Sequence, residues 1–370
     1  MEFLLIEPIA KTPYPPLGLM KISSMLKSKY KDCCLFSQVG NKIPKEIKNP
    51  KEIYITSLFT WDLDKVVDSI RYYSRLFPSA KIKVGGIAAS LYPEFISSKT
   101  GIQPHQGLLE EAEDYSPDYH QNFERKLNSS LTFTSRGCIR NCPFCTVRTV
   151  EPEFFTKNNW EEDICDSFPT VTFWDNNWLA SPNIEKDCAK LIKLNKKVDF
   201  NQGLDARLYD ENKARMLSKI NINPIRFAFD DISYEKYVLK AIRLAKKYSK
   251  NEIRVYVLYN FRDKPEDFFY RINLLNKEKV LSFPMEYRSA TDIQKKFPGK
   301  HWNLPILRAI KLSLLFYYHK GMITESRQSF RNIYGRNQKT FINKLYKIYE
   351  YDKKIVKNKN KEKELKDEKN

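Results

Sequence analysis

Long apolar runs and a secretion signal are both missing from this sequence of 370 residues. No stretch reaches the roughly 20 apolar residues that a membrane span needs. The first residues, MEFLLIEPIAK, lack the basic region and the cleavage site of a signal peptide. We therefore expect a cytoplasmic protein that does not contact a membrane.

Cysteine and histidine are scarce as well. Seven cysteines, an odd number, are too few for a disulfide framework in a chain of this length. The four histidines have no spacing that is typical of a metal site. Hydrophobic residues nevertheless make up 42% of the chain, which excludes global disorder and allows about two domains.

The chain has only 45 acidic residues against 64 lysines and arginines, which gives a formal net charge of +19. More than half of this excess lies in residues 301–370. A basic region of this kind is typical of nucleic-acid binding, so a nucleic acid is one candidate substrate or partner. Lysine-rich proteomes show the same bias, and charge alone therefore identifies no partner.

The first hundred residues alternate between strand and helix patterns. Short apolar runs typical of buried strands occur at Phe3–Glu7, Ile53–Leu58 and Ile82–Gly86. Apolar residues recur at helical spacing in Leu19–Tyr30 and Asp62–Phe77. Such alternation predicts a parallel sheet with crossover helices. We expect a Rossmann-like domain over residues 1–100 and a polar, acidic linker over 101–130.

A second alternating pattern covers residues 131–300. Strands are predicted at 131–135, 171–175, 198–202, 225–229, 253–258 and 281–285. Helices are predicted between them, at 184–196, 210–219, 234–248 and 265–276. Eight βα units close a TIM barrel, so six predict a partial (β/α)6 TIM-type barrel with its chemistry at the carboxyl ends of the strands. The fold class is therefore α/β.

The C-terminal residues complete this organisation. Residues 305–350 show helical spacing of apolar residues, so a helical extension is expected over 301–352. Residues 353–370 are rich in Lys, Glu and Asn and nearly lack apolar residues. We expect a basic tail there that is disordered or a solvated helix.

Three of the cysteines lie within eight residues, directly after the first strand of the second pattern. They are Cys138, Cys142 and Cys145, with the spacing Cys-x3-Cys-x2-Cys. Three thiolates this close converge on one centre only if the backbone wraps around it, which Gly137 and Pro143 allow. A structural zinc site normally takes four ligands, whereas an iron–sulfur cluster can use three thiolates. The remaining interpretation is that the three cysteines are buried and chemically inert.

The motif and its position resemble the radical S-adenosylmethionine (SAM) superfamily over residues 131–300. An aromatic residue, Phe144, precedes the last cysteine, as it does in that superfamily. The resemblance implies that Cys138, Cys142 and Cys145 hold a 4Fe-4S cluster, whose fourth iron chelates SAM. It further implies reductive cleavage of SAM to a 5′-deoxyadenosyl radical, with Phe144 beside the adenine.

Further cofactor contacts are predicted at the ends of later strands. The superfamily often has a Gly-Gly-Glu motif after the second strand, where this chain has Asp175, Asn176 and Asn177 as candidate partners of the SAM ammonium. This match is partial, and a simple turn is the alternative. Arg207 is the candidate partner of the SAM carboxylate, because a guanidinium binds carboxylates bidentately, and a salt bridge with a nearby aspartate is the alternative. Tyr259 closes the fifth strand and is expected to line the cavity.

The N-terminal pattern is similar to the cobalamin-binding-type domain that many of these enzymes carry. The similar segments are YPPLGL at 14–19 and VGGI at 84–87. The histidine of the base-off cobalamin signature is missing, since no histidine precedes position 105. Cobalamin without a protein ligand would rest on Gly85 and Gly86, but a domain without this cofactor is favoured.

These observations predict a radical SAM enzyme whose substrate is not identified. A one-electron reductant such as a flavodoxin or ferredoxin is the implied partner. Methylthiolation is disfavoured, because no second set of three cysteines is present to hold a second cluster. The alternative is a zinc-stabilised nucleic-acid-binding protein without catalysis, which bound zinc in place of iron would indicate.

Overall fold

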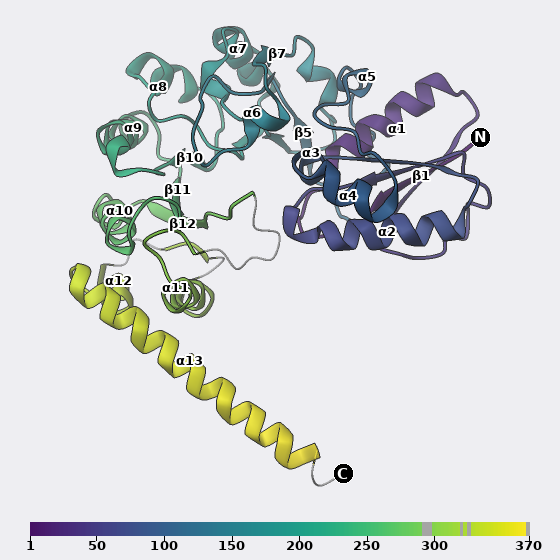
Figure 1. Ribbon diagram of the computed structural model, residues 1–370. Coiled ribbons are helices and arrows are strands. Elements are labelled where there is room, and N and C mark those ends of the chain that lie inside the picture. The colour runs from purple at the N-terminus through teal and green to yellow at the C-terminus, as the bar shows by residue number, and fades with distance from the viewer. Residues whose placement is uncertain (291–297, 319–320, 324–326, 368–370) are drawn as a thin grey trace. The chain divides into compact units, whose positions relative to one another are not determined.

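The computed structural model describes residues 1–290, 298–318, 321–323 and 327–367 (Figure 1). The chain divides into two compact units, the first made mainly of Met1–Gln202 and the second of Gly203–Ser289 with the C-terminal residues. Of the described helices, none combines the length and apolar character needed to cross a lipid bilayer. The domain boundaries expected from the sequence stay predictions.

A four-stranded parallel sheet begins the first unit, where the sequence predicts a Rossmann-like domain. Its order is β2-β1-β3-β4, with β1 at Glu2–Glu7, β2 at Cys34–Val39, β3 at Glu52–Thr56 and β4 at Lys81–Gly85. Because successive residues of a strand point to opposite faces, β1 supplies both sides of the sheet with core residues. Leu4 and Ile6 pack with helix α2 (Leu63–Leu76), while Phe3 and Leu5 pack with helix α1 (Leu17–Lys29).

The acidic segment after this sheet is packed against it, although the sequence suggested a linker. Helix α5 (Glu110–Glu113) contributes Ala112 to the cluster formed by Phe3 and α1, and Phe123 of the same segment is only 1% exposed there. Single apolar residues among polar ones give no periodic signal, which is why the sequence did not reveal this packing.

The second alternating pattern forms two three-stranded parallel sheets. The first unit holds β5 (Ser129–Thr132), β8 (Thr170–Phe173) and β9 (Lys197–Phe200), in the order β5-β8-β9. The second unit holds β10 (Ile225–Ala228), β11 (Ile253–Tyr259) and β12 (Leu281–Glu286), in chain order. All six predicted strands are present near their expected bounds. One continuous six-stranded partial barrel stays a prediction, because the two sheets belong to different units.

Helices separate these strands as the periodicity predicts. They are α7 (Ile184–Leu194), α8 (Glu211–Leu217), α9 (Glu235–Tyr248) and α10 (Pro265–Lys277). In α9 the buried residues Val238, Ala241, Ile242 and Ala245 follow the three- and four-residue spacing of one helix face. The remaining short elements are α3 (Ile87–Leu91), α4 (Pro93–Thr100), α6 (Val147–Val150), the pair β6 (Ser135–Arg136) and β7 (Phe155–Thr156), and 3-10 turns η1 (Thr60–Asp62), η2 (Trp160–Asp163), η3 (Trp178–Ala180) and η4 (Ile232–Tyr234).

The described residues of the C-terminal extension contain the helices α11 (Leu304–Tyr317), α12 (Arg327–Tyr334) and α13 (Gln338–Asp367). The last of these runs through the stretch for which we expected disorder or a solvated helix (Figure 1). Its first half is anchored by Phe341 and Leu345, which are fully buried, whereas Ile355 and Val356 are exposed. Lys and Glu are good helix formers, so this stretch extends as a helix without an apolar face to bury.

We predict that removal of residues 353–370 leaves stability nearly unchanged. The truncation removes Ile355 and Val356, which are exposed, and retains the pair of Arg308 with Asp352, whose atoms lie 2.7 Å apart. We expect a change of less than about 0.5 kcal/mol in the free energy of unfolding, measured by denaturant titration. Leu345→Ala is the contrasting variant and should cost about 2–5 kcal/mol, because it leaves a cavity in the helix packing. A truncation as costly as Leu345→Ala would contradict the prediction.

Candidate cysteine-loop site

The three clustered cysteines lie in a loop that follows β5 and β6, beside the carboxyl end of the β5-β8-β9 sheet. Cys138 and Cys142 are partly exposed and Cys145 is exposed, so ligands can reach all three thiols. Cys188, in contrast, is buried in α7, and burial raises the pKa of its thiol to about 12. Cys34, at the start of the edge strand β2, is exposed.

Two N–H groups point to the sulfur of Cys138. The backbone N–H of Arg140 donates to Sγ at 3.4 Å, and the side-chain amide of Asn177 donates to it at 3.8 Å. Donors of this kind favour a thiolate over a thiol, and they tune the sulfur ligands of iron–sulfur clusters. The structure therefore places Asn177, a predicted site residue, against the first cysteine. Phe144 is partly buried within the same loop.

The cysteine loop fits an iron–sulfur cluster by its chemistry. Three accessible thiols come from one short segment, and the first of them receives hydrogen bonds. Within the described ranges, no group of three or more His, Cys, Asp and Glu side chains is arranged to hold a metal ion. The convergence of Cys138, Cys142 and Cys145 on one centre therefore stays a prediction.

Gly137 begins the loop in a conformation that other residues rarely adopt. Its φ is +71°, and a Cβ at this position would lie 2.0 Å from the backbone oxygen of Glu153. The backbone at 137 can approach that at 153 only because the side chain is missing. The sequence suggested that Gly137 allows the loop to wrap, and this close backbone approach gives the steric reason why a glycine is needed there.

Glu151 gathers three donors at the entrance of this loop. One carboxylate oxygen accepts from the Gly137 N–H at 2.7 Å and from the Asn176 side-chain amide at 2.9 Å. The other accepts from the Arg136 guanidinium at 3.1 Å. Asn176, a predicted SAM contact, is thereby engaged in holding the loop. This carboxylate thus holds Arg136 and Gly137, the two residues directly before Cys138.

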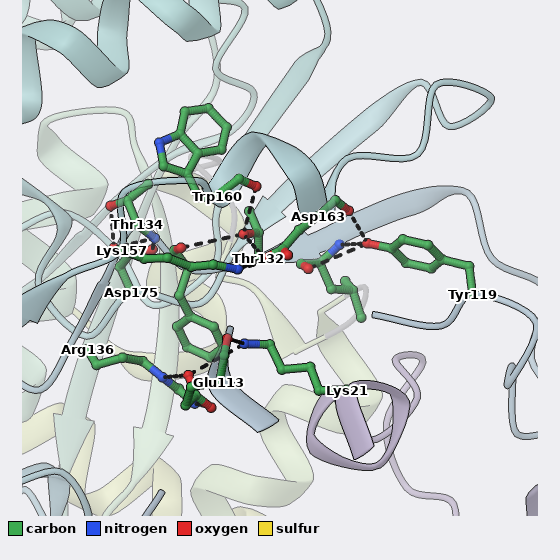
Figure 2. Close-up of polar contacts among 12 residues, drawn as sticks. Lys21, Glu113, Tyr119, Thr132, Thr134, Arg136, Lys157, Trp160, Asp163 and Asp175 are labelled. Carbon is green, nitrogen blue, oxygen red and sulfur yellow. Dashed lines mark hydrogen bonds and ion pairs between the residues drawn. The ribbon is translucent and has the colours of Figure 1, made fainter. Parts of the chain in front are cut away.

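Arg136 continues this contact into a row of alternating charges (Figure 2). Its guanidinium donates to both carboxylate oxygens of Glu113, at 2.8 and 3.0 Å. Lys21 of α1 donates to the Glu113 backbone oxygen at 2.7 Å. Burial alone would raise the pKa of Glu113, but Arg136 and Lys21 hold it below its usual value. The row joins the N-terminal sheet layer to the cysteine loop within the first unit.

Asp175 holds the two residues that precede Arg136. It is 3% exposed and accepts from the backbone N–H and the hydroxyl of both Thr134 and Ser135, at 2.6 to 3.1 Å. Burial raises its pKa to about 6, against the opposing effect of these hydrogen bonds. Asp175 was predicted to contact the SAM ammonium; in the structure its oxygens are engaged by the Thr134–Ser135 turn.

The other predicted contacts belong to the second unit. Arg207 forms a bidentate salt bridge with Asp205, at 2.7 and 3.1 Å, which is the alternative considered for it, and lies over the ring of Tyr234. Tyr259 is 3% exposed and its ring packs 5.0 Å from that of Phe268, so it belongs to an aromatic core. SAM binding by Arg207 and Tyr259 stays a prediction.

Gly86, one of the glycines expected to support cobalamin, has a role within the fold. Its φ is +105°, and a Cβ there would lie 2.5 Å from the backbone oxygen of Ser57. Close approach of Ser57, the residue after β3, to the turn before α3 therefore explains the glycine without a ligand.

No protein-family model and no curated protein matches this chain. Among solved structures, it is similar to Streptococcus suis SuiB bound to the precursor peptide SuiA, with a TM-score of 0.37 and 16% identity over 51% of this chain and 46% of that one. Streptococcus suis SuiB bound to S-adenosylmethionine gives a TM-score of 0.35 and 16% identity over 51% and 44%. The match spans about half of the SuiB chain, and likeness this low assigns no activity.

Sequence reasoning missed the residues that hold the loop in place. Glu113 lies in the segment interpreted as a linker, and Glu151 lies beyond the motif. One available signal was Arg136, the sole charge in the otherwise uncharged segment LTFTSRG at 131–137. An arginine at the end of a predicted buried strand needs carboxylate partners, and these are Glu113 and Glu151 in the structure.

We predict that Asp175→Asn changes the pH dependence of stability in a defined direction. The native carboxyl binds its proton more tightly than the unfolded one, whose pKa is near 3.8. The native state thus loses stability as the pH rises from about 4 to about 6, where the buried group ionises. An asparagine side chain does not titrate, so the stability of the variant relative to the wild type should increase over this range. Urea titrations at several pH values measure it, and a flat difference would contradict the assignment.

We predict that Glu151→Ala loosens the cysteine loop. Loss of the carboxylate leaves the Gly137 N–H and part of the Arg136 guanidinium without their acceptor. We expect a loss of about 3 kcal/mol in stability. Alkylation of Cys138, followed by mass spectrometry, should become several-fold faster.

The matched control for this variant is Glu153→Ala. Glu153 lies in the same segment, but its side chain is exposed. Its removal should leave the Cys138 alkylation rate unchanged. Equal acceleration in both variants would show that Glu151 has no special role.

Proposed function

We propose that this chain is a radical SAM enzyme whose 4Fe-4S cluster is held by Cys138, Cys142 and Cys145. The observation that carries the proposal is the Cys-x3-Cys-x2-Cys loop with accessible thiols, directly after the first strand of a run of parallel βα units. In βα folds of this type, chemistry is located on the loops after the carboxyl ends of the strands. Three thiolates also suit a cluster that keeps one iron open better than they suit a structural zinc site.

The chain's own residues would prepare the cysteine loop for its cofactors. Glu151 and Asp175 fix the backbone before Cys138, while the Asn177 amide and the Arg140 N–H favour its thiolate. The bound cluster and SAM would supply one-electron chemistry that removes a hydrogen atom from a substrate. A flavodoxin or ferredoxin is the class of reductant that this chemistry needs.

The predicted SAM contacts differ in how well the local geometry supports them. Asp175 and Asn176 are engaged in holding the loop, so they are better described as positioning residues. Phe144 and Asn177 lie in or against the cysteine loop and remain the stronger candidates for contact with SAM. Arg207 would have to exchange Asp205 for the SAM carboxylate.

The proposal predicts that the loss of any one loop cysteine abolishes cluster binding. Cys138→Ala, Cys142→Ala and Cys145→Ala should each lower the iron retained after anaerobic reconstitution, because three thiolates are the minimum set for this cluster. Iron analysis and the absorption near 400 nm measure the loss, and 5′-deoxyadenosine formation should fall below detection. Cys34→Ser, which replaces an exposed cysteine outside the loop, is the matched control and should behave as the wild type.

Two results would contradict the proposal. The first is full iron content and 5′-deoxyadenosine formation in Cys138→Ala. The second is wild-type protein that binds zinc but no iron, which would favour a zinc-stabilised nucleic-acid-binding protein.

A further inference from the structure

A pocket in the second unit lies beside the N-terminal turns of helices α8 and α9. Its volume is about 380 Å³. Its wall includes four cationic side chains and one carboxylate, together with two tyrosine rings: Arg207, Lys213, Lys236, Lys240, Asp210, Tyr209 and Tyr237. Helix α9 begins after strand β10, so its N-terminus lies on the side of the carboxyl ends of the β10-β11-β12 sheet. In α/β folds this is the side on which ligands bind.

The positive charges of this pocket are only partly compensated. Arg207 is paired with Asp205, and Lys213 with Asp210. Lys236 and Lys240 are one helical turn apart on one face of α9, and among the described residues neither has a carboxylate within salt-bridge distance. The Lys236 ammonium lies 4.9 Å from the centroid of the Tyr237 ring. Burial would raise the pKa of Asp210, but Lys213 and the positive charge of Lys240 lower it. These two ammonium groups of α9 therefore supply the net positive charge of the pocket, since its two other cations are each paired with an aspartate.

The end of helix α9 adds to this positive potential. Its N-cap residue, Tyr234, makes no side-chain cap hydrogen bond. The N-terminus of a helix carries a partial positive charge, so the positive charge of Lys236 in the first turn is placed unfavourably, and Glu235 in the same turn offsets part of this effect. A bound anion would remove this penalty and would accept hydrogen bonds from the same lysines.

The pocket is larger than an inorganic anion and is not lined by charge alone. Ala206 and Leu208 contribute apolar surface, beside the two tyrosine rings. Its volume falls within the range of about 300–1,000 Å³ that small-molecule sites occupy. The occupant should thus combine an anionic group with an organic body.

We propose that this pocket binds a phosphate monoester, with the phosphate at Lys236 and Lys240 and the organic body against Leu208 and Tyr237. A phosphate offers several oxygen acceptors for two or more ammonium groups. This proposal does not depend on the cysteine loop or on radical chemistry. Phosphate-monoester binding can therefore fail while the radical SAM function holds, and the radical SAM function can fail while phosphate-monoester binding holds.

The test is calorimetric titration of the full-length chain with AMP as the probe, beside adenosine and inorganic phosphate. AMP should bind measurably, inorganic phosphate at least about tenfold more weakly because it lacks the organic body, and adenosine more weakly still. The double variant Lys236→Gln/Lys240→Gln should lose about tenfold in AMP affinity for each lysine removed. Raising the salt concentration should weaken AMP binding to the wild type more than to this variant.

The matched control is Lys246→Gln/Lys247→Gln, which removes the same charge from the last turn of the same helix. These lysines pair with Glu278 and Glu211 outside the pocket, and AMP affinity should stay within about twofold of the wild type. Adenosine that binds as tightly as AMP, equal losses in both double variants, or binding of a single-stranded oligonucleotide without binding of AMP would overturn the proposal.

Discussion

Two carboxylates, one buried and one largely buried, hold the backbone that leads into the cysteine loop. Asp175 satisfies the donors of Thr134 and Ser135, and Glu151 satisfies those of Arg136 and Gly137. An ionised carboxylate is costly to bury unless its oxygens are hydrogen-bonded, and here four consecutive residues provide the donors. The position of the first cysteine depends on this arrangement, since Cys138 follows directly.

Much of the secondary structure could be predicted, because the local spacing of apolar residues determines it. Apolar runs and helical spacing of apolar residues signal the strands β1, β3–β5 and β8–β12 and the helices α1, α2 and α7–α10. The short pair β6 and β7 and the short helices α3–α6 were not predicted. The pairings that hold the loop have no such signal. Arg136 meets Glu113 and Glu151 through folds of the chain that no local pattern encodes. The division of the six strands into two sheets is likewise a long-range property.

The site could be predicted in its residue types but not in every role. The spacing of Cys138, Cys142 and Cys145 marked the loop, and Asn177 does lie against it. Asp175 was singled out because it ends a strand, yet burial directs its oxygens to the chain itself. For Arg207 the residue type was suitable, but Asp205, two residues away, already binds the guanidinium that was predicted to bind the SAM carboxylate. Sequence shows which groups are available, whereas burial determines which of them are free to bind.

The row from Lys21 through Glu113 to Arg136 has a consequence for how this architecture can evolve. Lys21 belongs to the N-terminal sheet layer and Arg136 to the strand before the cysteines, so the two regions share one set of charges with little exposure (Figure 2). If recombination replaced the N-terminal layer and Glu113 with a foreign domain, the largely buried guanidinium of Arg136 would keep only Glu151 as its carboxylate partner. Exchange of the N-terminal layer without the loop should therefore lower the stability of the cysteine loop.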